Sequence, residues 1–235
     1  MNKKITFVVA HPDDEVIWFA PFFNKDIFDI EGLDCSRCSK EIICLTCGDN
    51  EIRSDEFRKI LDRFNVDGKI MDIPIKRGIS YKNYRQINIA IRSLFKTKPD
   101  IVITHCLYGE DHFHPQHILT SISCLINSIS TNSLIISSAS SRSYLSNMLN
   151  AINRTNFISI KSILFLPIKI FLITLDLLLF KKMPSTFKAE TTVIKDSIDI
   201  YESQSTDYER FNNNEFRYAK LRPAIDYLLN KNIYE

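Results

Sequence analysis

Short runs of β-branched and apolar residues alternate with longer amphipathic stretches from the start of the chain to about residue 138. This pattern predicts strands at 5–10, 41–46, 69–73, 100–104 and 133–138. It predicts helices between them at 15–24, 55–65, 83–96 and 117–129. Strands that alternate with helices are typical of an α/β domain, and right-handed crossovers then make the sheet mostly parallel. We therefore expect a Rossmann-like, doubly wound α/β fold of three layers.

An apolar segment interrupts this pattern in the second half of the chain. Residues 157–180 are almost entirely apolar, apart from three charged side chains, Lys161, Lys169 and Asp176. The length is adequate for a membrane-spanning helix, but the charges and Pro167 count against insertion. A helix at the membrane surface, a buried helix and an oligomer face all remain open. We expect one domain over residues 1–235, with an inserted apolar helical segment at about 157–183.

The pattern resumes after this segment. It predicts a strand at 188–193, a helix at 195–203 and a final helix at 217–229 that returns to the domain.

The overall composition limits the classes of partner. The chain has 30 basic and 28 acidic side chains, a net charge of +2, which does not suggest a nucleic-acid-binding surface. Its first apolar run stops after six residues, too short for a signal-peptide core. We expect a cytoplasmic protein. An extension of this expectation is that residues 157–183 contact the inner face of the membrane peripherally.

The six cysteines fit that compartment as free thiols. Two Cys-x-x-Cys pairs, Cys35 with Cys38 and Cys44 with Cys47, are separated by only five residues. Structural zinc sites have a longer spacer, so free thiols are the preferred interpretation.

Metal-ligating side chains follow two of the predicted strands. His11 and Asp14 come directly after 5–10, and the other four of the five histidines lie between His105 and His117. The carboxyl ends of parallel strands meet at one edge of a sheet, where such sheets bind ligands. His11 and Asp14 are three positions apart and can chelate one ion, with a third ligand from His114 or His117. Two nitrogens and one carboxylate leave a position open for water, as in catalytic zinc sites.

Asp13 lies between these two candidate ligands and is not needed as a third. Zinc would lower the pKa of a water toward ~7, and Asp13 can then accept its proton as a general base. The competing interpretation of Asp13 is an ordinary helix cap. His105 ends a predicted strand and is expected to be a structural histidine, and neither it nor His112 is expected to be a ligand.

Two motifs resemble those of a known family. The string from Ala10 to Glu15 after an apolar strand, together with His114-Pro115-Gln116-His117 after a second strand, resembles the PIG-L, or LmbE-like, family of zinc-dependent N-acetylglucosaminyl deacetylases. Two further segments resemble the same family; they contain Arg53 and Glu56, and Lys195, Tyr201, Ser203 and Gln204. The resemblance implies an LmbE-like fold.

The resemblance also implies roles for individual residues. One zinc ion per chain would be held by His11, Asp14 and His117, although such ligands accept other divalent ions. Asp13 would be the base, and His114 would stabilise the oxyanion or protonate the leaving amine. Arg53 would contact substrate hydroxyls or an attached phosphate. The implied substrate is an N-acetylglucosamine-type sugar, lipid- or nucleotide-linked in glycan or glycoconjugate biosynthesis, which is deacetylated with release of acetate.

One departure from the family pattern concerns Gln116, which stands where the family has an aspartate. The carboxylate that normally orients the neighbouring histidine is then missing, and activity could be reduced. One alternative function is therefore a catalytically weakened, membrane-associated sugar-binding protein. Another is a metal-dependent phosphoesterase, which would need two ions about 4 Å apart and more carboxylates than the motifs supply.

Overall fold

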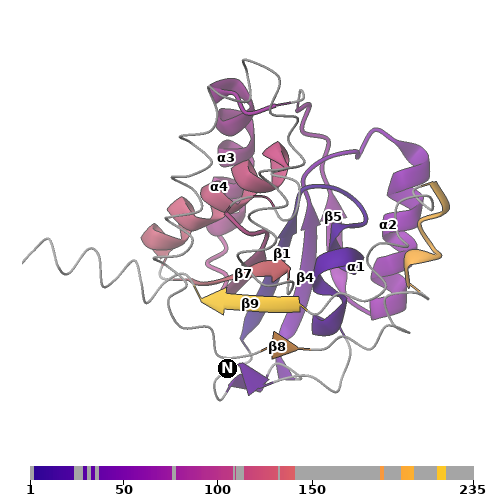
Figure 1. Ribbon diagram of the computed structural model, residues 1–235, viewed down its shortest axis with the longest axis horizontal. Coiled ribbons are helices and arrows are strands. Elements are labelled where there is room, and N and C mark those ends of the chain that lie inside the picture. Colours follow the sequence, from indigo (N-terminus) through magenta and orange to yellow (C-terminus); the bar gives the residue numbers. More distant parts are fainter. Residues whose placement is uncertain are drawn as a thin grey trace, which may run out of the picture.

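A parallel sheet forms the centre of the computed structural model (Figure 1). The described residues are 3–23, 29–30, 33–34, 37–75, 78–107, 109, 114–131, 133–140, 186–187, 197–203 and 216–220. The five parallel strands, in spatial order, are β5 (Asp67–Ile70), β4 (Ser39–Cys44), β1 (Lys4–Val9), β6 (Ile101–Thr104) and β7 (Leu134–Ser140). Beside β7 lie β9 (Phe216–Lys220) and then β8 (Thr186–Phe187), while β2 (Asp29–Ile30) and β3 (Leu33–Asp34) form a separate pair. The sequence order reverses at β1, which confirms the predicted doubly wound, mostly parallel sheet.

Helices cover both faces of this sheet (Figure 1). On one face lie α1 (Asp14–Phe19), the 3-10 helix η1 (Ala20–Phe22) and α2 (Glu51–Phe64), and on the other lie α3 (Tyr81–Phe95) and α4 (Pro115–Thr131). This arrangement confirms the three layers. The predicted apolar insertion at 157–183 and the predicted strand at 188–193 lie outside the described residues. No described helix combines the length and the hydropathy needed to cross a membrane.

The core is divided into two halves by the sheet. Successive side chains of a strand point to opposite faces, so Phe7 and Val9 of β1 join the half under α1 and α2, whereas Val8 joins the half under α3 and α4. Phe57 of α2 and Ile87 of α3 are fully buried in these two halves. A shift of β1 by one residue would move each of these side chains into the other half of the core, where the packing is shaped for different residues.

Polar caps set where α2 and α3 begin. The side chain of Asn50 accepts the backbone N–H of Arg53 at 3.1 Å, and that of Ser80 accepts the N–H of Asn83 at 3.1 Å. Such caps satisfy amide groups that have no partner within the helix. Both helices therefore begin before the predicted 55 and 83. The Asn50 cap places Arg53 in the first turn of α2.

The predicted final helix at 217–229 is wrong at its start. Residues Phe216–Lys220 form β9, which runs antiparallel to β7 with Ile136 opposite Lys220 and Ser140 opposite Phe216. Residues 221–229 lie outside the described part of the chain. An unpaired β7 would be an open edge of the sheet, and β9 supplies partners for its backbone N–H and C=O groups. Pairing with a distant strand here overrides the local helical pattern.

The central strand β6 gives a direct test of the core. Ile103→Ala should lower the free energy of unfolding by about 2–5 kcal/mol, because the fully buried Ile103 side chain leaves a cavity when it is shortened. Urea denaturation followed by circular dichroism measures the change. Ile89→Ala on α3 is the matched control, since Ile89 is 59% exposed, and it should change stability by less than about 0.5 kcal/mol. Equal losses for both variants would contradict this core.

Candidate metal centre

The chain makes a strained turn where β1 ends. The backbone N–H of His11 donates to Asp14 Oδ2 at 2.7 Å, which closes the turn onto a side chain three residues ahead. Asp13 has φ +117°, a conformation that side-chain-bearing residues rarely adopt. Backbone of this kind persists where the surroundings hold it, and it is enriched at functional sites. The turn brings the side chains of His11 and Asp14 together, with the nearest atoms 3.3 Å apart.

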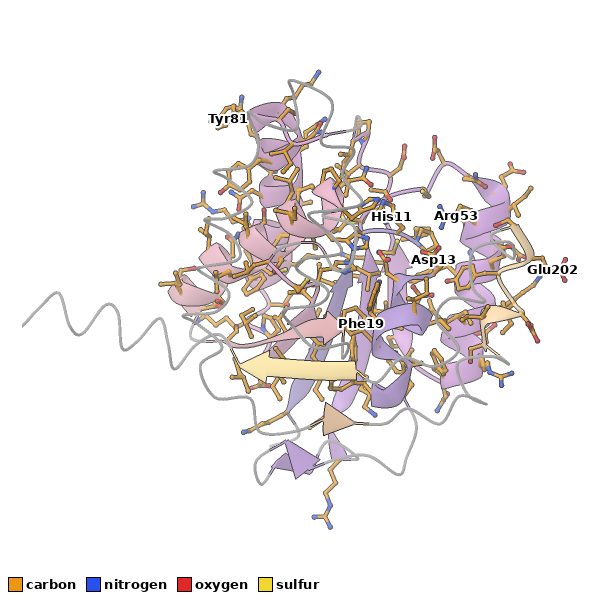
Figure 2. All side chains as sticks on the ribbon, in the orientation of Figure 1. His11, Asp13, Phe19, Arg53, Tyr81 and Glu202 are labelled. Atoms are coloured by element: carbon orange, nitrogen blue, oxygen red, sulfur yellow. The ribbon has the colours of Figure 1, made fainter. Side chains whose placement is uncertain are left out.

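Asp13 contacts Arg53 rather than capping the helix. It occupies the position before α1, but its side chain makes no capping hydrogen bond. Its Oδ2 lies 3.3 Å from Nη2 of Arg53, and the two residues are labelled side by side in Figure 2. The same nitrogen donates to the carbonyl of Pro12. The helix-cap interpretation of Asp13 is therefore not supported. Burial and the neighbouring Asp14 charge raise the pKa of Asp13 well above its usual value, although Arg53 acts in the opposite direction.

The second motif enters the site through the loop after β6. Gly109 has φ +74°, and a Cβ atom there would lie 2.6 Å from the backbone nitrogen of His114. Glycine is therefore required at this position. The carbonyl of Gly109 accepts the N–H of His114 at 2.9 Å, so His114 is fixed immediately before α4. His117 follows in the first turn of that helix.

The three predicted metal ligands converge on one point. Nδ1 of His11 is 3.3 Å from Asp14 Oδ2 and 3.3 Å from Nε2 of His117, and that Nε2 is 3.3 Å from Asp14 Oδ1. Zinc binds tetrahedrally at about 2.0–2.1 Å, which places neighbouring ligand atoms about 3.3 Å apart. Two imidazole nitrogens with either oxygen of Asp14 therefore fit one divalent metal ion such as zinc.

Two more histidines surround the same point. Among the described residues, the groups of three with ligand atoms all within 4.8 Å of one another are His11, His114 and His117, and Asp14, His105 and His117. His117 belongs to both groups, so the five side chains form one cluster around it. The donor geometry alone thus allows more than one choice of ligands, and hydrogen bonding must distinguish them.

His105 packs against the cluster on its buried side. It is fully buried, its ring stacks on that of His117 at a centroid distance of 3.8 Å, and its Nε2 accepts the backbone N–H of Ala10 at 3.1 Å. An imidazole nitrogen has one lone pair, so a nitrogen that accepts an N–H cannot also bind an ion. This agrees with the predicted structural role of His105. Sequence reasoning nevertheless missed its 3.3 Å approach to Asp14, although its place directly after β6 was a usable signal.

Asp14 and His114 have opposite electrostatic environments. Burial alone would raise the pKa of Asp14, but the neighbouring histidines, His117 above all, outweigh it and lower the pKa well below the usual value. Burial, with the charges of His117 and His11, lowers the pKa of His114 to about 3. Asp14 is therefore an anion and His114 a neutral imidazole. Nδ1 of His114 is buried and has no hydrogen-bond partner among the described residues, as expected for a group that meets a bound ligand.

Two residues near the end of the described chain, Tyr201 and Ser203, donate hydrogen bonds to glutamates of α1 and α2. The hydroxyl of Tyr201 donates to Glu15, 186 positions earlier, and burial raises the pKa of Glu15 to about 7. The backbone N–H and hydroxyl of Ser203 donate to the two carboxylate oxygens of Glu56 at 2.9 and 2.6 Å. The two weaker family-like segments therefore meet each other and the first motif.

Comparison with known families identifies one whose members match this part of the chain. Residues 6–124, just over half of the chain, match the model of the PIG-L family, described as GlcNAc-PI de-N-acetylase. The matched region includes His11, Asp13, Asp14, Arg53 and both histidines of the second motif. The chain belongs to the PIG-L family, which confirms the resemblance inferred from its motifs.

Solved structures agree on the fold. A deacetylase of the teicoplanin biosynthesis pathway has a TM-score of 0.58 and 11% identity, with 93% of this chain and 98% of that chain covered. The A40926 pseudoaglycone deacetylase Dbv21 has a TM-score of 0.56 and 13% identity, with coverage of 94% and 98%. No curated protein matches the sequence. At these identities the likeness establishes a shared fold.

The buried Tyr201–Glu15 contact can be tested through stability. Tyr201→Phe should lower the free energy of unfolding by about 1–3 kcal/mol, because a buried oxygen of Glu15 loses its hydroxyl donor. Thermal and urea unfolding measure the loss. Tyr84→Phe on α3 removes a hydroxyl that has no hydrogen bond among the described residues, and it should leave stability nearly unchanged. An unchanged Tyr201→Phe protein would show that this contact does not stabilise the fold.

Proposed function

We propose that this chain is a zinc-dependent hydrolase that removes the acetyl group from an N-acetylglucosamine-type sugar. Membership of the PIG-L family supports N-deacetylation of a sugar. The observation that carries the proposal is the convergence of His11, Asp14 and His117, in which each pair places two ligand atoms 3.3 Å apart. These three residues would hold the ion. When bound, zinc would polarise the acetamide carbonyl and lower the pKa of the attacking water.

Asp13 is the proposed general base. It adjoins the metal-ligand Asp14 in sequence but contacts Arg53, so its carboxylate is not needed to hold the ion. Its raised pKa makes it a stronger proton acceptor than an ordinary aspartate. In the proposed reaction Asp13 takes a proton from water as the oxygen attacks the acetyl carbon. The proton then passes to the sugar nitrogen as the C–N bond breaks, which yields acetate and a free amine.

His114 is the proposed oxyanion donor. With a pKa of about 3 it is neutral, so it acts as a hydrogen-bond donor through its ring N–H and not as a cation. Its buried Nδ1 has no partner among the described residues, and its ring lies 4.3 Å from that of His117, centroid to centroid. A preorganised donor beside the reacting carbonyl stabilises the charge that develops in the transition state. This favours oxyanion stabilisation over protonation of the leaving amine.

Arg53 is proposed to link the base to the substrate. Its guanidinium holds Asp13 and the carbonyl of Pro12, and it carries five N–H donors. In this proposal the same group also contacts a hydroxyl or a phosphate of the sugar derivative. Substrate binding and positioning of the base would then be coupled through one side chain.

The two histidines of the second motif provide a matched pair of variants. His117→Ala should lose tightly bound zinc and with it the release of acetate from an N-acetylglucosamine derivative. His114→Ala should keep about one zinc per chain, because three ligands remain, yet release acetate far more slowly. Zinc content after gel filtration and enzymatic assay of acetate measure both properties.

The outcomes separate the candidate ligand sets. Loss of zinc in His114→Ala would favour the group of His11, His114 and His117 over the proposed one. Wild-type protein that binds zinc but releases no acetate from any acetamido sugar tested would contradict deacetylation.

The base assignment predicts a separate kinetic effect. Asp13→Asn keeps the size and most contacts of the side chain but cannot accept the proton, so kcat should fall about 10²- to 10⁴-fold. The zinc content of the variant should equal that of the wild type. Full activity of Asp13→Asn would exclude Asp13 as the base, and loss of zinc would show that it is a ligand instead.

A further inference from the structure

Gln116 contacts a metal-ligand histidine. It is the second residue of α4, between the two histidines of its motif, and its Oε1 is hydrogen-bonded to Nε2 of His11. The contact joins residues 105 positions apart. The motif comparison indicated only that a carboxylate is missing at this position. The structure shows that the amide engages the histidine of the other motif.

The contact restricts the protonation state of His11. A neutral imidazole carries one N–H and one lone pair, on different nitrogens. An amide oxygen is only an acceptor, so Nε2 must carry the proton when it faces Oε1 of Gln116. The lone pair then lies on Nδ1, which faces Asp14 Oδ2 and Nε2 of His117 at 3.3 Å each.

The reversed amide would give the opposite result. If the amide nitrogen of Gln116 donated to His11, the proton would lie on Nδ1 and no lone pair of His11 would face Asp14 and His117. That state is incompatible with His11 as a ligand through Nδ1. The convergence of His11, Asp14 and His117 thus favours the orientation in which the amide oxygen accepts.

We propose that Gln116 is a positioning residue that holds His11 in the Nε2–H tautomer and presents Nδ1 for metal binding. The proposal rests on the metal site proposed above for the use of that lone pair. A carboxylate could fix the same tautomer, but it would add a negative charge beside a ring whose other nitrogen already faces Asp14. The amide orients the ring without that charge. In this proposal the amide of Gln116 takes over the orienting function of the missing carboxylate.

Nuclear magnetic resonance reads the tautomer directly. Long-range ¹H–¹⁵N spectra of metal-free protein labelled at its five histidines distinguish Nε2–H from Nδ1–H rings, and His11→Asn identifies the His11 signals. In the wild type, the neutral ring of His11 should be in the Nε2–H form, because Oε1 of Gln116 can only accept. Gln116→Glu should retain this form because a carboxylate also accepts, whereas Gln116→Leu should lose it.

Zinc affinity provides the second measurement. Competition with a chromophoric chelator should show a 10- to 100-fold weaker affinity for Gln116→Leu and near-wild-type or tighter affinity for Gln116→Glu. Gln86→Leu on α3 is the matched control, because Oε1 of Gln86 has no hydrogen-bond partner among the described residues. It should change neither affinity nor tautomer. Circular dichroism of each metal-free variant identifies any that fail to fold.

Different results of the two measurements would overturn different claims. An Nδ1–H ring in the wild type, or a Gln116→Leu protein with unchanged tautomer and affinity, would overturn the role of Gln116. A folded Gln116→Glu protein that behaves like Gln116→Leu would show that side-chain shape, not the acceptor, matters, and would also overturn it. Absence of zinc binding in a wild type with the expected tautomer would refute the proposed metal site but not the orientation of His11.

Discussion

The parallel pairing of β1 with β6 is the constraint on which the site depends. Val8 lies opposite Thr104 in this pair, so the residues that follow each strand emerge side by side. The N–H of Ala10 then donates to His105, which extends the alignment beyond the last ladder residue. The positions of the cluster residues depend on this pairing. His11 and Asp14 directly follow β1, and the loop that leads to His114 and His117 directly follows β6. The parallel ladder from Ile5 opposite Ile101 to Val8 opposite Thr104 keeps these two segments aligned.

Three consecutive carboxylates beside that junction show how local environment differentiates similar side chains. Asp13 faces Arg53, Asp14 faces histidines, and Glu15 accepts from Tyr201 in the interior. Burying charges without partners is costly, so each carboxylate has its own compensation. The pKa of Asp14 is lowered, while burial raises the pKa values of Asp13 and Glu15. The proposed division between a ligand, a base and a supporting acid reflects these separate partners.

Much of the fold and the site could be predicted from sequence because both follow from local patterns. Alternating apolar residues locate the strands, and the rule that parallel strands share a carboxyl edge brings His11 and Asp14 near His117. Features that depend on distant contacts could not be predicted in this way. The strand at 216–220 forms because β7 would otherwise be an open edge, and no local pattern encodes that edge. The Tyr201–Glu15 contact, the stacking of His105 on His117 and the φ of +117° at Asp13 likewise arise only when the segments meet.

The central claim is that two segments about a hundred residues apart share one metal ion. Anomalous diffraction at the zinc absorption edge, from crystals of the zinc-loaded protein, tests it most directly. The account predicts one strong peak at about 2.0–2.2 Å from Nδ1 of His11, a carboxylate oxygen of Asp14 and Nε2 of His117. A peak that lies on other residues, or that leaves either His11 or His117 without contact to the ion, would contradict it.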